Sequence, residues 1–260
     1  MNILITGGNG FIASELAKHL SSSHSITTVS RQDFNLTAFQ AMNKFFEGKY
    51  FDAVLHCAVQ GGNRLKQDSY RDMDVNLTSY YNLLQHKPHY GKLIYFGSGA
   101  ETHSPESPYG LSKRIIAKSV SEIPNFYNLR IYGVFGESEL ESRFIKGNVK
   151  RYINKQPLQI HQDKFMDFFY IKDLATLVDH YIQNTNVAKE VNCSYSYIWS
   201  LGKIAQFINN LDDHKVDINH MQEGFGKGYH YNGVNYLPDL SFVGLEEGIK
   251  EVYNKLKHEH

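Results

Sequence analysis

Cysteine, net charge and long hydrophobic runs are what this sequence lacks. Its 260 residues include only two cysteines, Cys57 and Cys193, which lie far apart in apolar, strand-like segments, so we expect reduced thiols rather than a disulfide framework. Lys plus Arg and Asp plus Glu each number 27, and the basic residues are scattered, which argues against nucleic acid or a membrane as a partner. The apolar stretches have strand length and are too short to span a bilayer.

Two further absences narrow the class of protein. The thirteen histidines show no helical zinc spacing, so no metal site is predicted. A strand-like segment begins within two residues of the start, which leaves no room for a signal peptide. We therefore expect a cytoplasmic globular protein of one large domain, carrying at most a small lobe.

Strand-like and helix-like segments alternate through the first half of the chain, which predicts an α/β fold with a doubly wound parallel sheet. The predicted strands are 2–6, 26–29, 51–57, 92–96 and 127–132, and the helix-like segments are 14–20, 38–48, 66–85 and the stretch around 109–113. After Gly136 the pattern changes: helix-like segments follow at 142–153 and 174–182, and a strand-like segment at 190–193. Beyond these, helix-like segments at 201–208 and 245–256 and a glycine-rich loop at 224–228 predict a small α-rich C-terminal lobe.

A glycine-rich turn follows the first predicted strand, with the spacing Gly7-x-x-Gly10-x-x-Ala13. Such a turn lets backbone amides approach a pyrophosphate, which the N-terminus of the next helix favours electrostatically. A plain structural turn is the alternative, but a turn that opens the first βα unit of an α/β chain favours a dinucleotide site. The residues expected to contact the dinucleotide are Gly7, Asn9, Gly10, Phe11 and Ile12.

The second predicted strand ends in Ser30-Arg31. A carboxylate at this place would bind both ribose hydroxyls and select NAD, whereas an Arg accommodates a 2′-phosphate. The nearest acid, Asp33, lies two residues beyond Arg31, so NADP(H) is favoured and NAD(H) remains possible. The alternative is that Arg31 is a solvated loop residue.

Small residues leave the carboxyl ends of the next two strands, where open α/β sheets bind ligands. They are Ala58, Gly61 and Gly62 after the third strand, and Ser98 and Gly99 after the fourth.

Tyr109 and Lys113 stand four residues apart, a separation that places both side chains on one face of a helix. Ser107 and Pro108 are suited to start that helix. A cationic Lys favours the phenolate form and lowers a phenol's pKa from its reference value of about 10, which suits acid–base chemistry near neutral pH. Alone, the pair could be a chance occurrence on a surface helix.

Together these features resemble the extended short-chain dehydrogenases/reductases, the NAD-dependent epimerase/dehydratase family that modifies nucleotide-diphosphate sugars, and in detail the GDP-fucose-synthase-like reductases. The resemblance implies a Rossmann-like NAD(P)-binding domain at 1–137, to which 166–197 returns, a substrate lobe at 138–165 and 198–260, and a homodimer paired through two long helices. The matching segments are Gly7–Ile12, His56–Ala58, Asn76, Ser98, Tyr109–Lys113, Leu129–Gly136 and Asp167–Asp173.

The resemblance also implies roles for individual residues. Tyr109 would be the general acid/base, Lys113 would bind the nicotinamide ribose, and Ser98 would bind the reacting oxygen of the sugar. Asn76 would lie near the cofactor. Gly61, Gly62, Gly99 and Arg143 would contact the substrate, with Arg143 either binding the diphosphate or lying solvated on its helix.

Positions where the sequence departs from the family limit which of the family's reactions we expect. The related 4,6-dehydratases carry Asp-Glu after the Ser position, where this chain has Gly99-Ala100, so dehydration is not expected. The epimerising fucose synthases use a Cys and a His where this chain has Ala100 and Arg143, although Glu101 could replace them if the loop is shifted. Met166 stands where the family usually has an Arg.

The leading hypothesis is an NADP(H)-dependent reductase of a nucleotide-linked 4-keto-6-deoxy sugar, acting at C4 without epimerisation. A C4 epimerase that holds NAD tightly is the second hypothesis. The third is a non-catalytic dinucleotide-binding regulator, which would predict a broken Ser–Tyr–Lys set.

Overall fold

The computed structural model describes residues 1–62, 67–233 and 237–259. These residues form two compact units, one of Met1–Ile131 with Leu177–Val191 and one of Tyr132–Thr176 with Asn192–His260. The units divide the chain at narrower limits than the predicted 1–137 and 166–197. Helix α7 (Ile171–Gln183) and strand β9 (Glu190–Cys193) each belong partly to both units.

A six-stranded sheet forms the centre of the first unit, in the order β2-β1-β3-β4-β5-β9. The first five strands pair in parallel, and the register places Thr6 beside both Val29 and His56, and Ser98 beside Ile131. The carboxyl ends therefore share one edge of the sheet, which confirms the predicted Rossmann-like fold. The strands are β1 (Asn2–Thr6), β2 (Ser25–Val29), β3 (Phe51–His56), β4 (Tyr90–Ser98) and β5 (Phe126–Ile131).

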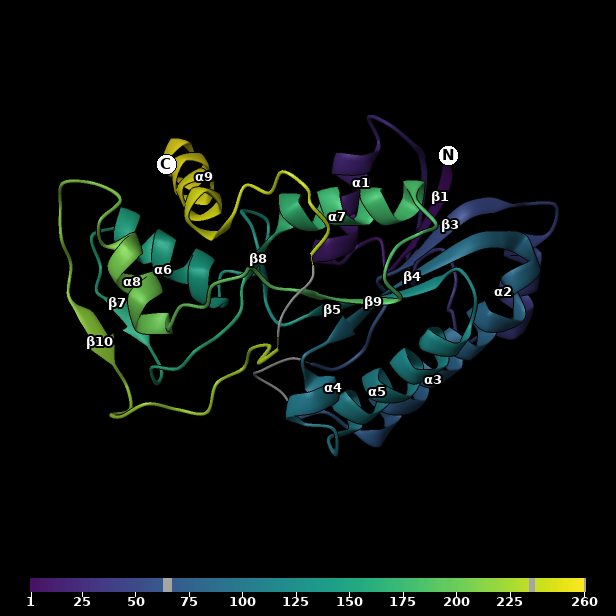
Figure 1. Ribbon diagram of the computed structural model, residues 1–260, viewed down its shortest axis with the longest axis horizontal. Coiled ribbons are helices and arrows are strands. Elements are labelled where there is room, and N and C mark those ends of the chain that lie inside the picture. The colour runs from purple at the N-terminus through teal and green to yellow at the C-terminus, as the bar shows by residue number, and fades with distance from the viewer. Residues whose placement is uncertain (63–66, 234–236, 260) are drawn as a thin grey trace. The chain divides into compact units, whose positions relative to one another are not determined.

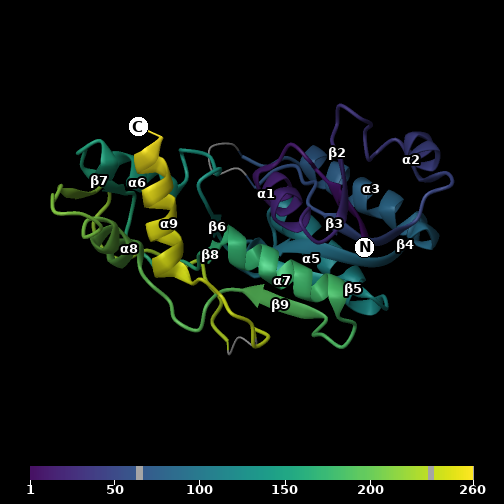
Figure 2. The ribbon, with the colours of Figure 1, turned by 90° about the horizontal axis from the view of Figure 1, so that it is seen from above.

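Helices cover both faces of this sheet. In Figures 1 and 2, α3 (Tyr70–Gln85) and α5 (Pro108–Glu122) run side by side on one face, and α1 (Phe11–Leu20) lies with α7 on the other. The apolar sides of β1, β3 and β4 pack against α2 (Phe39–Phe46), α3 and α5 to form a continuous core. Two short helices, η1 (Lys87–His89) and α4 (Ala100–His103), flank β4.

Two serine caps decide where the long helices begin. Ser69 and Asp72 form a capping box, each side chain accepting from the other's backbone N–H, so α3 begins at Tyr70 rather than near residue 66 as predicted. Lys66 itself lies outside the described residues. The Ser107 hydroxyl accepts from the Gly110 N–H at 3.0 Å, and Pro108 occupies the first turn of α5, as predicted.

Lys92 of β4 binds the last turn of α7, which belongs to the same unit. Its ammonium donates to the carbonyls of Tyr181, Ile182 and Asn184 at 3.1, 2.7 and 2.8 Å. The last carbonyls of a helix commonly accept from groups outside it, and a cation also offsets the negative end of the helix dipole. The contact therefore caps α7 and fixes it to the sheet.

Among its described residues, the second unit contains the helices α6 (Phe144–Ile153), α8 (Leu201–Ile208) and α9 (Leu245–His258), the start of α7, and two pairs of short parallel strands. Strand β6 (Val134–Phe135) pairs with β8 (Phe169–Tyr170), and β7 (Leu158–Ile160) pairs with β10 (Ile218–His220). The segment 224–228 forms neither helix nor strand, as predicted.

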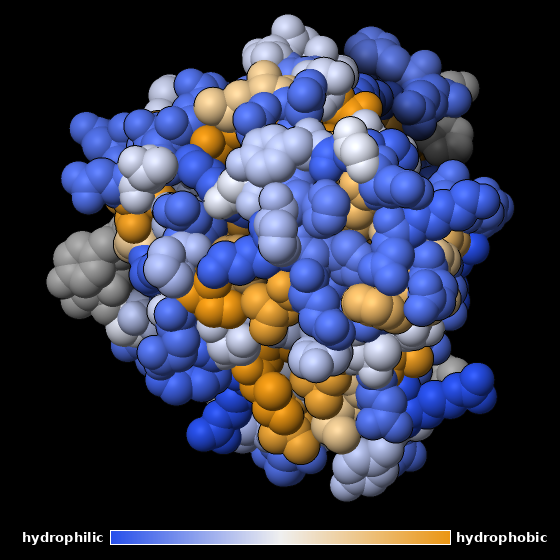
Figure 3. All heavy atoms as spheres, turned by 90° about the vertical axis from the view of Figure 1, so that its right-hand side faces the viewer, coloured by the Kyte–Doolittle hydropathy of each residue, from blue (hydrophilic) through white to orange (hydrophobic). Residues whose placement is uncertain are grey.

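The surface of the first unit is mainly hydrophilic. Figure 3 shows charged and polar residues over most of this face, with apolar residues gathered chiefly in its lower half. No helix within the described residues is long and apolar enough to cross a membrane. Across the same ranges, no group of three or more His, Cys, Asp or Glu side chains is placed to hold a metal ion.

Candidate active site

The glycine turn between β1 and α1 is shaped by close backbone contacts. Gly7 has φ +76°, and a Cβ at this position would lie 2.8 Å from the Cα of Ala58, so a larger residue would not fit. The Gly8 N–H donates to the Val29 carbonyl at 2.9 Å, and the Gly10 N–H donates to the Gly7 carbonyl at 2.8 Å. The turn therefore lies directly against the carboxyl ends of β2 and β3.

The start of α1 is suited to an anion. Gly10 is the N-cap and supplies no side-chain cap, and the first turn contains no acidic residue. Asn9 and Gly10 are exposed, and Phe11 and Ile12 are half-buried. Backbone amides at the positive end of a helix dipole bind a pyrophosphate without further charge. The five residues expected from the sequence thus form a cradle that fits a dinucleotide.

The end of β2 differs from the expectation that no acid lies there. A tight turn brings Asp33 back, so that its carboxylate accepts from the Ser30 N–H at 2.8 Å and from the Ser30 hydroxyl at 2.9 Å. These hydrogen bonds hold the pKa of Asp33 below its ordinary value. Arg31 is exposed at the same turn. The strand end therefore carries both an acid and a base, which the linear spacing did not reveal.

Tyr109 and Lys113 lie on the first turns of α5, with both side chains directed to the edge of the sheet. The Lys113 ammonium donates to the Phe96 carbonyl of β4 at 2.6 Å. It lies 4.7 Å from the centre of the Tyr95 ring and 5.7 Å from that of the Tyr109 ring. The helix therefore places the two residues together, as their spacing predicted.

Ser98 is the last residue of β4 and is 7% exposed. Its hydroxyl accepts from the Ala100 N–H at 3.2 Å, a local turn that does not use the hydroxyl proton. The same segment packs closely against α5, because a Cβ on Gly110 would lie 2.0 Å from the Ser104 carbonyl oxygen and 2.8 Å from that of Ala100. This contact holds the first turn of α5 beside Ser98.

Burial controls ionisation around Lys113. Burial lowers the pKa of Lys113 to about 8, and the carboxylate of Glu101 opposes this decrease. Burial also lowers the pKa of His56 to about 3, assisted by the charge of Lys113, so this imidazole is neutral at pH 7. Thr6 Oγ1 lies 2.9 Å from His56 Nδ1 and accepts from the Ala58 N–H at 3.2 Å. His56 is thus a neutral support for the end of β3.

Asn76 of α3, which the resemblance places near the cofactor, joins the loop after β3 to helix α5. Its side-chain oxygen accepts from the Gln60 N–H at 2.8 Å, and its amide donates to the Gln60 carbonyl at 2.9 Å and to the Ser112 hydroxyl at 3.2 Å. Asn76 is 4% exposed. The side chain therefore fixes the loop after β3 to helix α5.

The loop that Asn76 fixes contacts the ring of Tyr109 through two glycines. Gly61 and Gly62 have φ +86° and +70°, and a Cβ on Gly62 would lie 2.7 Å from the Cζ of Tyr109. The Gly62 N–H donates to Asp68 at 2.7 Å. The tyrosine ring therefore packs on bare backbone, and the two glycines predicted to meet the substrate border the phenol.

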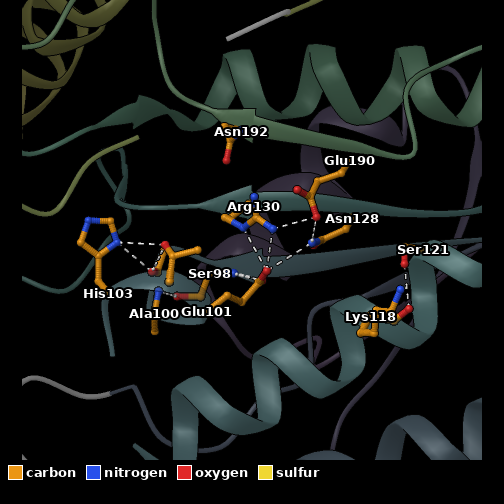
Figure 4. Close-up of polar contacts among 12 residues, drawn as sticks. Ser98, Ala100, Glu101, His103, Lys118, Ser121, Asn128, Arg130, Glu190 and Asn192 are labelled. Atoms are coloured by element: carbon orange, nitrogen blue, oxygen red, sulfur yellow. Dashed lines mark hydrogen bonds and ion pairs between the residues drawn. The ribbon is translucent and has the colours of Figure 1, made fainter. Parts of the chain in front are cut away.

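A buried charged network that sequence reasoning missed lies behind Ser98 (Figure 4). Glu101 Oε1 accepts from the Ser98 N–H at 2.7 Å, and its Oε2 lies 2.9 Å from both Nε and a terminal nitrogen of Arg130. Arg130 also pairs with Glu190 at 2.7 Å. Glu101 is 4% exposed, and both its oxygens are engaged. It is therefore poorly placed to replace the missing epimerase base.

The predicted substrate residues of the second unit are less well defined. Arg143 is the N-cap of α6, its side chain is 36% exposed, and its Nε lies 4.0 Å from Glu139. Met166 is 2% exposed, so its position presents no polar group in place of the family's Arg. Asp167 accepts from the Tyr231 N–H at 2.7 Å, and burial raises its pKa to about 6.

The chain is similar to known proteins over most of its length. It is 27% identical over 261 residues to a UDP-glucuronate 4-epimerase of Thermodesulfobacterium geofontis, a match that covers 85% of this chain and 77% of the relative. The structure of a GDP-6-OMe-4-keto-L-xylo-heptose reductase from Campylobacter jejuni matches with a TM-score of 0.80 at 16% identity, over 100% of this chain and 98% of that one. A GDP-L-fucose synthetase from Naegleria fowleri bound to NADP matches with a TM-score of 0.80 at 17% identity, over 99% and 93% of the two chains.

The family itself follows from the sequence match. The pattern of the NAD dependent epimerase/dehydratase family matches residues 3–194, which include the glycine turn, Ser98, Tyr109 and Lys113. The match confirms the resemblance drawn from these motifs. The protein belongs to the NAD dependent epimerase/dehydratase family.

Proposed function

We propose that the protein reduces a nucleotide-diphosphate-linked 4-keto-6-deoxy sugar at C4, with NADP(H) as the cofactor and without epimerisation. The observation that carries this proposal is the grouping of Ser98, Tyr109 and Lys113 at the carboxyl edge of the sheet, bordered by the bare backbone of Gly61 and Gly62. Such a group can protonate and polarise a carbonyl held against it.

The residues would share the reaction as follows. The bound nicotinamide supplies a hydride to C4. Tyr109 donates its phenolic proton to the carbonyl oxygen, so a C–H and an O–H bond form as the carbonyl π bond breaks. The Ser98 hydroxyl donates a hydrogen bond to the same oxygen and stabilises its developing charge. Lys113 stabilises the phenolate left on Tyr109, which then regains a proton from solvent.

The neighbouring residues favour simple reduction. Gly99 and Ala100 have no proton to give to a leaving hydroxyl, and Glu101 is held by the Ser98 N–H and by Arg130. Neither a dehydratase acid nor an epimerase base is therefore supplied by this segment.

Arg31 supports the choice of NADP(H). It is exposed at the end of β2, while one oxygen of the nearby Asp33 carboxylate accepts both hydrogen bonds from Ser30. A guanidinium binds a 2′-phosphate well, and the Naegleria fowleri structure was solved with NADP.

A C4 epimerase with tightly held NAD is the second candidate. Asp33 favours it, because a carboxylate at the end of β2 can also bind the ribose hydroxyls. The Thermodesulfobacterium geofontis relative is likewise a 4-epimerase. A non-catalytic regulator is less favoured, since Ser98, Tyr109 and Lys113 are all present.

The experiment that separates these candidates identifies the cofactor. Purified protein is denatured, any released dinucleotide is identified, and NADPH and NADH are titrated against the protein and its Arg31→Ala variant. We expect exchangeable binding with NADPH preferred, and an affinity for NADPH about 10-fold weaker in R31A. A stoichiometric, co-purifying NAD would favour the epimerase instead.

We also propose a homodimer paired through α3 and α5. Tyr70, Tyr81 and Ile115 of these helices are 68%, 59% and 45% exposed, and Figure 3 shows apolar groups on this unit's surface. Light scattering should give the mass of two chains for the wild type, and of one chain for a variant combining Tyr81→Glu with Ile115→Glu.

A further inference from the structure

Glu101 is a buried acid beside the site, and its contacts differ from those of a catalytic group. One oxygen accepts from the Ser98 N–H at 2.7 Å and the other pairs with Arg130 at 2.9 Å. Gly97 makes room for it, because a Cβ there would lie 2.3 Å from Glu101 Oε1 and 2.2 Å from Asn128 Oδ1. The carboxylate is therefore enclosed by protein groups next to Ser98.

Lys113 and Glu101 bind the same strand two residues apart. The ammonium donates to the Phe96 carbonyl at 2.6 Å, and the carboxylate accepts from the Ser98 N–H. Each charge influences the ionisation of the other. Opposite charges in a water-poor interior interact more strongly than in solvent.

Glu101 and Cys57 both favour the charged form of Lys113, but burial raises the pKa of the Cys57 thiol and keeps it neutral, which leaves Glu101 as the negative charge beside the ammonium. Arg130 is a second cation, and Glu190, which pairs with it, is 41% exposed and bonds Arg130 and Asn128. The groups that face Lys113 or Glu101 are His56 and Cys57 from β3 and its end, Tyr95 from β4, Tyr109 from α5, Arg130 from β5 and Glu190 from β9.

We propose that Glu101 is a positioning residue that fixes the backbone of Ser98 and supplies the buried negative charge that keeps Lys113 protonated. Its effect on turnover rests on the proposed function, whereas its effect on Lys113 is a property of the protein without substrate or cofactor.

The test follows Lys113 by NMR in cofactor-free protein labelled with ¹³C-lysine, the Cε signal being assigned with Lys113→Arg. In Glu101→Gln, which keeps an oxygen for the Ser98 N–H but removes the charge, we expect the titration midpoint of Lys113 to lie about 1 pH unit lower. Glu190→Gln is the matched control, because it removes the same charge from Arg130 on the solvent side, and it should leave the midpoint within about 0.3 unit. Equal midpoints in E101Q and wild type would overturn the proposal.

If E101Q fails to fold, Arg130→Gln replaces it, and the Lys113 midpoint is then expected to shift in the opposite direction. R130Q removes a neighbouring cation while Glu101 stays, so the Lys113 midpoint should rise. A midpoint unchanged in R130Q would contradict an electrostatic coupling of Lys113 to the Glu101–Arg130 pair, and with it the proposal.

Turnover supplies a separate readout once a substrate is found. The alkaline limb of the kcat profile should move to lower pH in E101Q and stay in place in E190Q. An inactive wild type with a shifted Lys113 titration in E101Q would refute the reductase alone. An active wild type with an unshifted titration would refute the role of Glu101 alone.

Discussion

The two compact units differ in how they hold the groups that chemistry requires. In the first, Ser98, Tyr109 and Lys113 are fixed by backbone contacts of β4 and α5. In the second, Arg143 is partly exposed beside Glu139, and Met166 is buried where the family has a cation. On the proposed function, the reaction centre is therefore fixed at the edge of the sheet, while the groups expected to recognise the substrate lie on a loop and a helix end.

The largest effect should come from Tyr109→Phe. Loss of the phenolic proton should lower turnover by about 10³-fold while dinucleotide affinity stays the same, because the ring still packs on Gly62. Tyr81→Phe, on the exposed side of α3, is the control and should turn over normally. Steady-state rates and a dinucleotide titration measure both; a Y109F variant within 10-fold of wild type would contradict the role of Tyr109.

The buried Lys113 should make stability depend on pH. Its pKa is about 8 in the folded chain against an ordinary value of 10.5, so between these values the unfolded chain binds the extra proton. Stability therefore rises with pH across this window. Chemical denaturation measures this effect. Between pH 7.5 and pH 10.5, the free energy of unfolding of the wild type should rise by about 3 kcal/mol more than that of Lys113→Met.

Replacing a lysine at the surface is the control, because it removes the same charge without involving a buried group. Lys44→Met removes an exposed lysine of α2, and its stability should follow the wild-type curve. Parallel curves for wild type and K113M would show that Lys113 keeps its ordinary ionisation in the fold.

Gly62→Ala tests the support of the tyrosine. The added methyl group meets the Tyr109 ring and requires a positive φ, so turnover should fall by about 10- to 100-fold. Gly48→Ala is the control, since Gly48 also has a positive φ, +66°, but nothing lies within 4 Å of its Cβ position. Both variants should lose about 1 kcal/mol of stability, and only G62A should lose activity.

The smallest effect is expected in the second unit. Arg143→Ala should raise KM for the nucleotide sugar by about 3- to 10-fold and leave kcat unchanged, because a diphosphate contact is made equally in the ground and transition states. Arg151→Ala, on the last turn of the same helix, should change neither constant. A kcat effect in R143A as large as that of Y109F would erase the contrast between the two units.

The fold and the reacting pair could be predicted because their signals are local. The alternation of strands and helices, the glycine turn and the i, i+4 spacing of Tyr109 and Lys113 are each visible in a few consecutive residues. Ser107 and Pro108 likewise predict the start of α5.

The parts of the site that could not be predicted depend on contacts between residues far apart in the sequence. Glu101 and Arg130 are 29 residues apart, and no periodicity joins them. Asp33 was placed beyond the end of β2 by counting along the chain, yet a tight turn returns it to Ser30. The resemblance places Asn76 near the cofactor, and its contacts with Gln60 and Ser112, which lie far from it in the sequence, show how it also fixes the loop after β3. For the second unit, no short motif announced the strand β10.

Transfer of a label from the cofactor to the sugar tests the central claim most directly. The protein is incubated with 4-deuterated NADPH, prepared as each of the two C4 epimers, and with nucleotide-linked 4-keto-6-deoxy sugars, and the products are analysed by mass spectrometry and NMR. We expect one deuterium at C4 of the sugar from one of the two NADPH epimers, with one NADP⁺ formed per product and unlabelled neighbouring carbons in D₂O. Interconversion of C4 epimers of a 4-hydroxy sugar, with no NADPH consumed and no deuterium gained, would contradict it.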